Sequence, residues 1–168
     1  MRTIRLTTWI QAPVERCFRL SLSIELLVTA GEKVSSGVRA GLLCPNDMVT
    51  RSGRCFGLKF QHTDLIDAVR PYAFFSEVMV EGTFSRFEHE HHFAALNDGT
   101  RVRDDLRFSC RGPAGELVEV LLQRRLSELV KMRNRAIRKA AESAEWQRYL
   151  PARKPTVAET REKVLFRA

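Results

Sequence analysis

Two histidines and one aspartate carry the clearest chemistry in this 168-residue sequence. His89 and His91 stand two residues apart in the segment FSRFEHEHHFAAL, and Asp104 follows in the next alternating segment. Alternate side chains of a β-strand point to the same face, so both imidazoles would project together. A neutral imidazole donates one hydrogen bond and accepts another, which suits ligand orientation, proton transfer or metal binding.

Metal binding is the most specific of these uses, and the sequence supports it least. A His-x-His pair on a strand has the ligand geometry of zinc or iron sites, with Asp104 or a Glu of a neighbouring strand as third ligand. Two histidines alone do not identify that third ligand, so we expect no metal and no other cofactor. A hydroxyl, the backbone or ordered water would satisfy these polar groups equally well. The trio Glu88, Glu90 and His92 is interpreted as a solvated charged face.

Strands must position these residues, and residues 38–110 have the alternation and turn chemistry of strands. The seven predicted strands are Ile4–Ile10, Val38–Leu43, Met48–Phe56, Leu58–Val69, Tyr72–Val80, Phe84–Leu96 and Thr100–Cys110. The connections at 45–47, 70–71, 81–82 and 97–99 hold Pro, Gly, Asn or Asp. Because the connections from residue 38 onward are short, these strands are predicted to be antiparallel neighbours.

A long helix is predicted over residues 115–145, which contain no proline and no glycine after Gly115. Apolar residues form one helical stripe: Val118, Leu121, Leu122, Leu126, Leu129, Val130, Ile137, Ala140 and Ala144. Two short helices are predicted after the first strand, one opened by Pro13 and one ended by Gly31.

This order of elements resembles the helix-grip fold of the START and polyketide-cyclase superfamily, also called SRPBCC proteins, in an uncharacterised bacterial ligand-binding branch. The resemblance rests on TWIQAPVERCFRLSLSIE, FGLKFQHTDLIDAVRPYAFF and VEGTFSRFEHEHHFAALNDGTRVRDDLRF, together with the long helix. It implies an α+β fold in which a seven-stranded antiparallel sheet wraps around a long C-terminal helix. It also implies a deep cavity for an apolar or aromatic ligand, but it specifies no activity.

Strand pairing predicts which residues face that cavity. With a two-residue turn at 98–99, Phe93 would lie opposite Asp104, and Glu90 opposite Arg107 on the other face. The second pair is charge-complementary, as exposed cross-strand pairs tend to be, so the first face is assigned to the helix.

The preceding hairpin is predicted to turn at 81–82, which places Phe74 opposite His89 and Glu77 on the outer face. A β-bulge there would shift the register by one residue and exchange the two faces. The predicted cavity-lining residues are Phe74, Ser76, Phe87, His89, His91, Phe93, Asp104, Leu106 and Phe108.

The net charge of +8 is concentrated at the C-terminal end, where residues 111–168 hold fourteen Lys and Arg against seven Glu. We interpret this as a solvated basic helix face, because the sequence has no nucleic-acid motif, and we expect no nucleic-acid partner. Residues 1–150 are predicted to be one ligand-binding domain and 151–168, with Pro151 and Pro155, a tail.

The four cysteines are far apart and form no CxxC pair, which indicates free thiols in a reducing compartment. Because no signal peptide and no membrane-spanning run is recognised, we expect a cytoplasmic protein with no integral membrane association. The sequence does not specify the oligomeric state.

The leading hypothesis is a carrier or sensor of a small hydrophobic molecule, with no catalytic residue. The alternative is a cyclase/aromatase-like or hydrolase-like enzyme in which a cavity histidine acts as general base and Asp104 fixes its tautomer. A third hypothesis is an interaction module that uses the basic helix and tail on anionic lipid or a partner protein. A His–Asp pair in the cavity would favour the enzyme, and a featureless apolar cavity would favour the carrier.

Overall fold

One seven-stranded antiparallel sheet forms the body of the protein in the computed structural model, which describes residues 1–55, 58–112 and 115–150. Its strands are β1 Arg2–Ile10, β2 Lys33–Gly37, β3 Met48–Cys55, β4 Leu58–Arg70, β5 Phe74–Gly82, β6 Phe84–Leu96 and β7 Gly99–Cys110. Their order is β1-β7-β6-β5-β4-β3-β2. The predicted α+β architecture, with a seven-stranded antiparallel sheet and a long helix, is confirmed.

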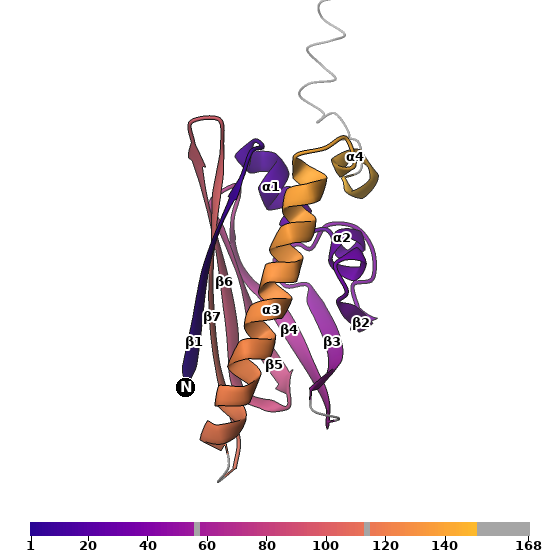
Figure 1. The fold of residues 1–168 in the computed structure, drawn as a ribbon. Coiled ribbons are helices and arrows are strands. Elements are labelled where there is room, and N and C mark those ends of the chain that lie inside the picture. Colours follow the sequence, from indigo (N-terminus) through magenta and orange to yellow (C-terminus); the bar gives the residue numbers. More distant parts are fainter. Residues whose placement is uncertain (56–57, 113–114, 151–168) are drawn as a thin grey trace, which may run out of the picture.

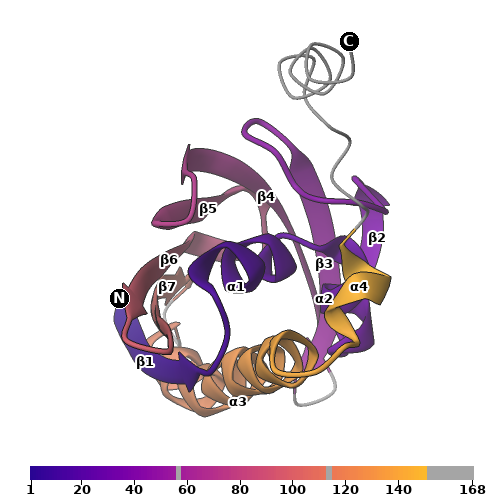
Figure 2. The same cartoon turned by 90° about the horizontal axis from the view of Figure 1, so that it is seen from above.

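Helices cover one face of this sheet. They are α1 Val14–Ser21, α2 Ile24–Thr29, α3 Gly115–Ala141 and α4 Trp146–Tyr149. The long helix α3 runs along the sheet (Figure 1), and seen from above the sheet curves from β1 around to β2 while α3 closes the open side (Figure 2). None of the helices in the described part of the chain is long and apolar enough to cross a membrane.

The predicted helix 115–145 ends four residues early, at Ala141. The Ser143 hydroxyl donates to the Lys139 carbonyl (2.9 Å) and accepts from the Glu145 amide (3.2 Å). Such a side chain offers the backbone an alternative to continued helix. Of the predicted stripe, Leu126, Val130 and Ile137 are buried, whereas Val118 and Leu121 near the helix start are exposed.

The second strand lies upstream of its predicted position, at Lys33–Gly37 rather than 38–43. Gly37 has φ +83°, and a Cβ there would lie 2.1 Å from the Met48 carbonyl oxygen, so the strand ends at this glycine. The predicted segment instead returns to the helices, where Leu43 donates to the Leu22 carbonyl (3.0 Å).

The hairpin between β6 and β7 turns one residue earlier than predicted, with Leu96 opposite Gly99. Asn97 has φ +46°, a left-handed conformation that asparagine tolerates. His91 therefore pairs with Asp104, which was predicted to lie opposite Phe93. The pairing is shifted by two residues, and such a shift keeps the faces unchanged, so these side chains face α3 as predicted.

The prediction assigned the side chains of β5 to the wrong faces of the sheet. Glu77 lies opposite His89 and is buried, although it was assigned to the outer face. Phe74 and Ser76 lie on the outer face, where the Phe74 ring contacts His92 at 5.0 Å between centroids. The cause is the connection: pairing between β5 and β6 stops before the predicted tight turn, and the end of β5 pairs with β4 alone. An odd change in register reverses every side chain.

Two apolar clusters fill the space between the sheet and the helices, and a polar layer separates them. Along β6 the order is Phe87, His89, His91 and Phe93. Along α3 it is Val130, Arg133, Asn134 and Ile137. In both elements the flanking residues belong to different clusters and the middle residues are buried and polar.

Candidate functional site

A cavity of about 340 Å³ lies between the sheet and α3. Its apolar walls are Phe60, Phe87, Leu106, Leu126, Leu129 and Val130. Its polar lining is Glu32, Lys33, Arg51, Ser52, His62, Asp64, Glu77, His89, Arg125 and Arg133, completed by Ala30, Gly31 and Gly53. Apolar walls with a few converging polar groups, at this size, are typical of small-molecule sites.

The predicted site residues fall into three groups. Phe87, His89 and Leu106 line the cavity. Buried behind its wall are His91, Phe93, Asp104 and Phe108. Phe74 and Ser76 lie on the opposite face of the sheet. Alternation along β6 and β7 therefore predicted correctly which face of these strands points toward the cavity. Phe74 and Ser76 of β5 were predicted to line it because the pairing of β5 with β6 was predicted in the wrong register.

Asp104 contacts both predicted histidines behind the cavity wall, to which His89 contributes. Its Oδ1 accepts a hydrogen bond from His91 Nδ1 (2.7 Å) and lies 3.2 Å from His89 Nε2. Its Oδ2 accepts from Asn134 Nδ2 (2.6 Å), which also donates to the Thr8 hydroxyl (3.1 Å). Three strands and α3 therefore fix one carboxylate, which has only 1 % of its surface exposed.

Burial sets the protonation of this group. Removal from water, followed by repulsion from His89 and Arg133, lowers the pKa of His91 to about 3 despite the hydrogen bond to Asp104. Burial alone would raise the pKa of Asp104, but the adjacent imidazoles of His89 and His91 outweigh it and hold that pKa well below its usual value. His91 is therefore neutral at pH 7, while Asp104 is ionised.

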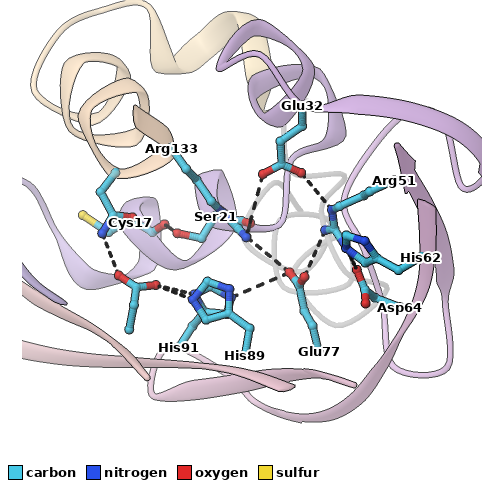
Figure 3. Close-up of polar contacts among 12 residues, drawn as sticks. Cys17, Ser21, Glu32, Arg51, His62, Asp64, Glu77, His89, His91 and Arg133 are labelled. Carbon is cyan, nitrogen blue, oxygen red and sulfur yellow. Dashed lines mark hydrogen bonds and ion pairs between the residues drawn. The ribbon is translucent and has the colours of Figure 1, made fainter. Parts of the chain in front are cut away.

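Glu77 occupies the centre of a second buried network (Figure 3). Its Oε2 lies 3.0 Å from Arg51 Nη2, and its Oε1 lies 3.3 Å from Arg133 Nη2 and 3.7 Å from His91 Nε2. Burial opposes ionisation, but the guanidiniums of Arg51 and Arg133 prevail and hold the pKa of Glu77 far below its usual range. Two strands and α3 are thus linked through one charged carboxylate.

Glu32 bridges the same two guanidiniums near the cavity mouth. Its Oε2 accepts from Arg51 Nε (2.8 Å), and its Oε1 lies 3.9 Å from Arg133 Nη1. The turn that ends α2 places it there: Glu32 N–H donates to the Leu27 carbonyl, and Gly31, at φ +98°, supplies the left-handed residue of a Schellman motif. The glycine predicted as a helix stop therefore also positions a charged cavity residue.

Asp64 and His62 complete the polar lining. Arg51 Nη1 donates to Asp64 Oδ2 (2.5 Å), and His62 Nε2 lies 3.2 Å from the same oxygen. Within the described residues, seven buried side-chain atoms lack a well-aligned hydrogen-bond partner. Six of them belong to this network: Arg51 Nη2, His62 Nδ1, Asp64 Oδ1, His89 Nε2, His91 Nε2 and Arg133 Nε. Folded proteins bury few such atoms, so their concentration here marks a candidate ligand site.

The residues that sequence analysis missed are Glu32, Arg51, His62, Asp64, Glu77, Arg133 and Asn134. The positions of some of these residues in the sequence pattern already indicated that they are buried. Arg133 and Asn134 follow Val130 by three and four positions, on the helical stripe itself. His62 and Asp64 alternate with the buried Ile66 along β4. Polar residues at core positions of an apolar pattern are the sign of a functional interior.

Two groups of side chains in the described part of the chain have metal-ligand spacing. His89, His91 and Asp104 each offer one donor atom within 4.8 Å of the others, and all three are buried. The second group, Glu90, His92 and Asp105, lies on the outer face of the same strands.

The fold is shared with several solved structures. Protein TTHA0849 from Thermus thermophilus has 24% sequence identity and a TM-score of 0.68, covering 84% of this chain and 100% of its own. A START superfamily protein from Mycobacterium smegmatis has 15% identity and a TM-score of 0.63, covering 82% and 97%. Ginseng major latex-like protein 151 from Panax ginseng has 11% identity and a TM-score of 0.61, covering 84% and 98%. The START-like resemblance is thereby confirmed as one of fold.

No protein-family model matches the chain, and no curated protein matches it in sequence.

Proposed function

Because the chain shares its helix-grip fold with a START superfamily protein and a major latex-like protein, we propose that it binds a small, largely apolar molecule between the sheet and α3. One observation carries the proposal: the cavity of about 340 Å³ combines phenylalanine and leucine walls with a buried polar end. Each Å² of apolar ligand surface removed from water contributes roughly 25 cal/mol. The walls therefore supply affinity, and the polar end supplies orientation.

The polar end favours a ligand with a hydroxyl, phenol or carbonyl group. His62 and His89 line the cavity and each has a ring nitrogen without a hydrogen-bond partner. The lining contains three carboxylates, Glu32, Asp64 and Glu77, and four cationic side chains, Lys33, Arg51, Arg125 and Arg133. Arg51 is already paired with all three carboxylates. A neutral ligand group would donate to or accept from the two histidines without disturbing these ion pairs.

The enzyme hypothesis is favoured by one specific observation, the buried pair of His91 and Asp104. Two features weigh against His91 as general base. Its pKa of about 3 is far below the neutral pH at which an efficient base titrates, and its free Nε2 faces Glu77 rather than the cavity. Two cavity-lining histidines beside an aspartate remain as candidates for that role, His89 with Asp104 and His62 with Asp64.

Ligand binding is tested by native mass spectrometry of the purified chain, which would detect a co-purified small molecule. Leu126 lines the cavity, so Leu126→Trp should fill it and abolish that mass addition. The control is Leu117→Trp, because Leu117 lies on the same helix with 66% of its surface exposed. Equal ligand occupancy in both variants, or no ligand of any class in the wild type, would contradict the proposal.

Affinity and turnover of the captured ligand separate a carrier from an enzyme. His89→Phe keeps a ring but removes its hydrogen bonds, so we expect affinity to fall by about 0.5–1.5 kcal/mol, with the ligand chemically unchanged. His91→Phe and Asp104→Asn are measured beside it. A general base would behave differently, with turnover falling roughly a hundredfold or more while affinity is preserved. That second result would establish the enzyme hypothesis.

We assign ligand binding to residues 1–150, with 151–168 as a tail outside the described residues, and place the protein in the cytoplasm. The support for this location is chemical: Cys17, Cys44 and Cys110 are free thiols, as expected in a reducing compartment.

A further inference from the structure

We propose that His89, His91 and Asp104 bind one divalent transition-metal ion at the inner end of the cavity. The sequence alone left the third ligand unidentified, and the strand register supplies it by placing His91 directly opposite Asp104. Metal binding at this position does not depend on whether the cavity also takes an organic ligand.

Both histidine donor atoms lie near the Asp104 oxygen at distances similar to those between neighbouring ligands of one metal ion. Asp104 Oδ1 lies 2.7 Å from His91 Nδ1 and 3.2 Å from His89 Nε2. Around a tetrahedral zinc ion with bonds of 2.0–2.1 Å, neighbouring ligand atoms are about 3.3 Å apart. The His89–Asp104 distance matches this spacing, the His91–Asp104 distance is about 0.6 Å shorter, and all three donor atoms lie within 4.8 Å of one another. All three residues are at least 96% buried, with exposed fractions of 4%, 2% and 1%.

Supporting hydrogen bonds of the kind that surround metal ligands are also in place. Asn134 donates to the Asp104 oxygen that does not face the histidines. On the other side of its ring, His91 directs Nε2 toward Glu77 Oε1 at 3.7 Å. With a metal on Nδ1, Nε2 carries the proton and points it at this carboxylate, which is the usual second partner of a metal-bound histidine.

Without a cation the same atoms are poorly matched. His91 Nδ1–H then donates to Asp104, which leaves an Nε2 lone pair facing a carboxylate, and both His89 Nε2 and His91 Nε2 lack a hydrogen-bond partner. Buried polar atoms without partners are costly. A metal ion would satisfy His89 Nε2 directly and would turn His91 Nε2 into a donor.

The donor set selects the class of metal. Two imidazole nitrogens and one carboxylate oxygen suit zinc or ferrous iron, whereas calcium and magnesium prefer oxygen ligands alone. Since His89 also lines the cavity, the remaining coordination position would open toward it.

The outer group of Glu90, His92 and Asp105 is the natural control, because arginines already neutralise it. Arg5 and Arg103 lie 3.3 and 3.1 Å from Asp105. Another guanidinium pairs with Glu90 at 3.1 Å. This group lies on the same two strands, but it has one histidine instead of two, and its carboxylates already have guanidinium partners.

The test is isothermal titration of the metal-free full-length chain with Zn²⁺. We expect one ion per wild-type chain and no loss of affinity in His92→Gln. Asn134→Ala should weaken binding by roughly 10–100-fold, as loss of an outer-shell partner does. His89→Gln and Asp104→Asn should weaken it more than that.

Each variant is checked for folding by circular dichroism before titration. X-ray absorption at the zinc edge of the wild-type complex decides the ligands even if a variant does not fold, since it should show two imidazoles. Absence of stoichiometric Zn²⁺ binding by the wild type would overturn the proposal. So would binding that survives His89→Gln but is lost in His92→Gln.

Discussion

At Glu77 a single carboxylate connects strands β3 and β5 to helix α3. It is 2% exposed and pairs with both Arg51 and Arg133. A buried ion pair contributes little net stability, because the desolvation of both charges offsets their attraction. Removal of one partner is different, since it leaves the other charge buried without compensation. Truncation of one of these charged side chains should therefore destabilise the protein by more than the intact ion pairs stabilise it.

Glu77→Gln should lower the free energy of unfolding by about 3–5 kcal/mol, the usual cost of breaking a buried charge pair. The measurement is urea unfolding at pH 7. Glu81→Gln is the matched control, because Glu81 lies on the same strand but is exposed, and its effect should stay within about 0.5 kcal/mol. Equal effects of the two substitutions would mean that Glu77 is not electrostatically coupled to the arginines.

The effect of Glu77→Gln should shrink in acid. The folded-state pKa of Glu77 is lowered, so its stabilising contribution is fully present above the unfolded-state pKa of about 4.3. It is lost as the pH falls toward the lowered folded-state value. Urea unfolding of both proteins at about pH 7, 5, 4 and 3 should show their free energies converging at the acid end. A difference that stays constant over this range would show that Glu77 is not ionised in the folded state.

Among the secondary-structure elements, the end of β2 depends most directly on one residue. Gly37 and Gly41 both have positive φ angles, +83° and +85°. They differ in surroundings, because a Cβ at Gly37 would lie 2.1 Å from the Met48 carbonyl oxygen, whereas nothing lies within 4 Å of one at Gly41. Alanine at Gly41 therefore tests the cost of the backbone conformation alone, whereas alanine at Gly37 adds steric contact with β3.

Gly41→Ala should cost about 1–2 kcal/mol, the energy of a left-handed conformation for a residue with a side chain. Gly37→Ala should cost clearly more, because the backbone of β3 must also move away. Thermal or urea unfolding of the two variants measures the difference. Equal destabilisation would indicate that the β2–β3 edge adjusts without strain.

At the scale of the whole molecule, the described residues include a basic surface on the solvent side of α3. Arg124, Arg135, Arg138 and Lys139 are exposed there. Part of this charge is compensated locally, since Arg138 pairs with Glu142 at 3.1 Å and Lys139 lies 3.7 Å from Glu145. Arg133, on the same helix, is buried in the cavity network and does not belong to this surface. The exposed face is thus a partly neutralised basic surface.

We expect this surface not to bind nucleic acid at physiological salt. A protein that neutralises phosphates releases counterions, so its affinity falls steeply as salt increases. Fluorescence anisotropy with duplex DNA and RNA, at low and physiological salt, provides the test. A micromolar or tighter complex that weakens with salt would reverse this expectation.

The sequence by itself determined the features that depend on local periodicity. Alternation and turn residues predicted six of the seven strands near their positions in the structure, and the absence of helix breakers after Gly115 predicted the long helix. The same alternation placed His89, His91 and Asp104 on the face toward α3, even with the hairpin register wrong by two residues. An even error preserves the face of a strand, so this part of the site was robust.

Only the tertiary structure decided the composition of the polar network. The connection between β5 and β6 sets a register that differs from the predicted one by an odd number of residues. Glu77 therefore points inward, and Phe74 and Ser76, which were predicted to do so, lie on the outer face. Arg51 and Arg133 come from segments far apart in the chain, and they meet at Glu77 only when the sheet curves beneath α3. Periodicity specifies which way a side chain points within its own element. Which charges meet depends on sheet order and curvature, and no local pattern encodes these.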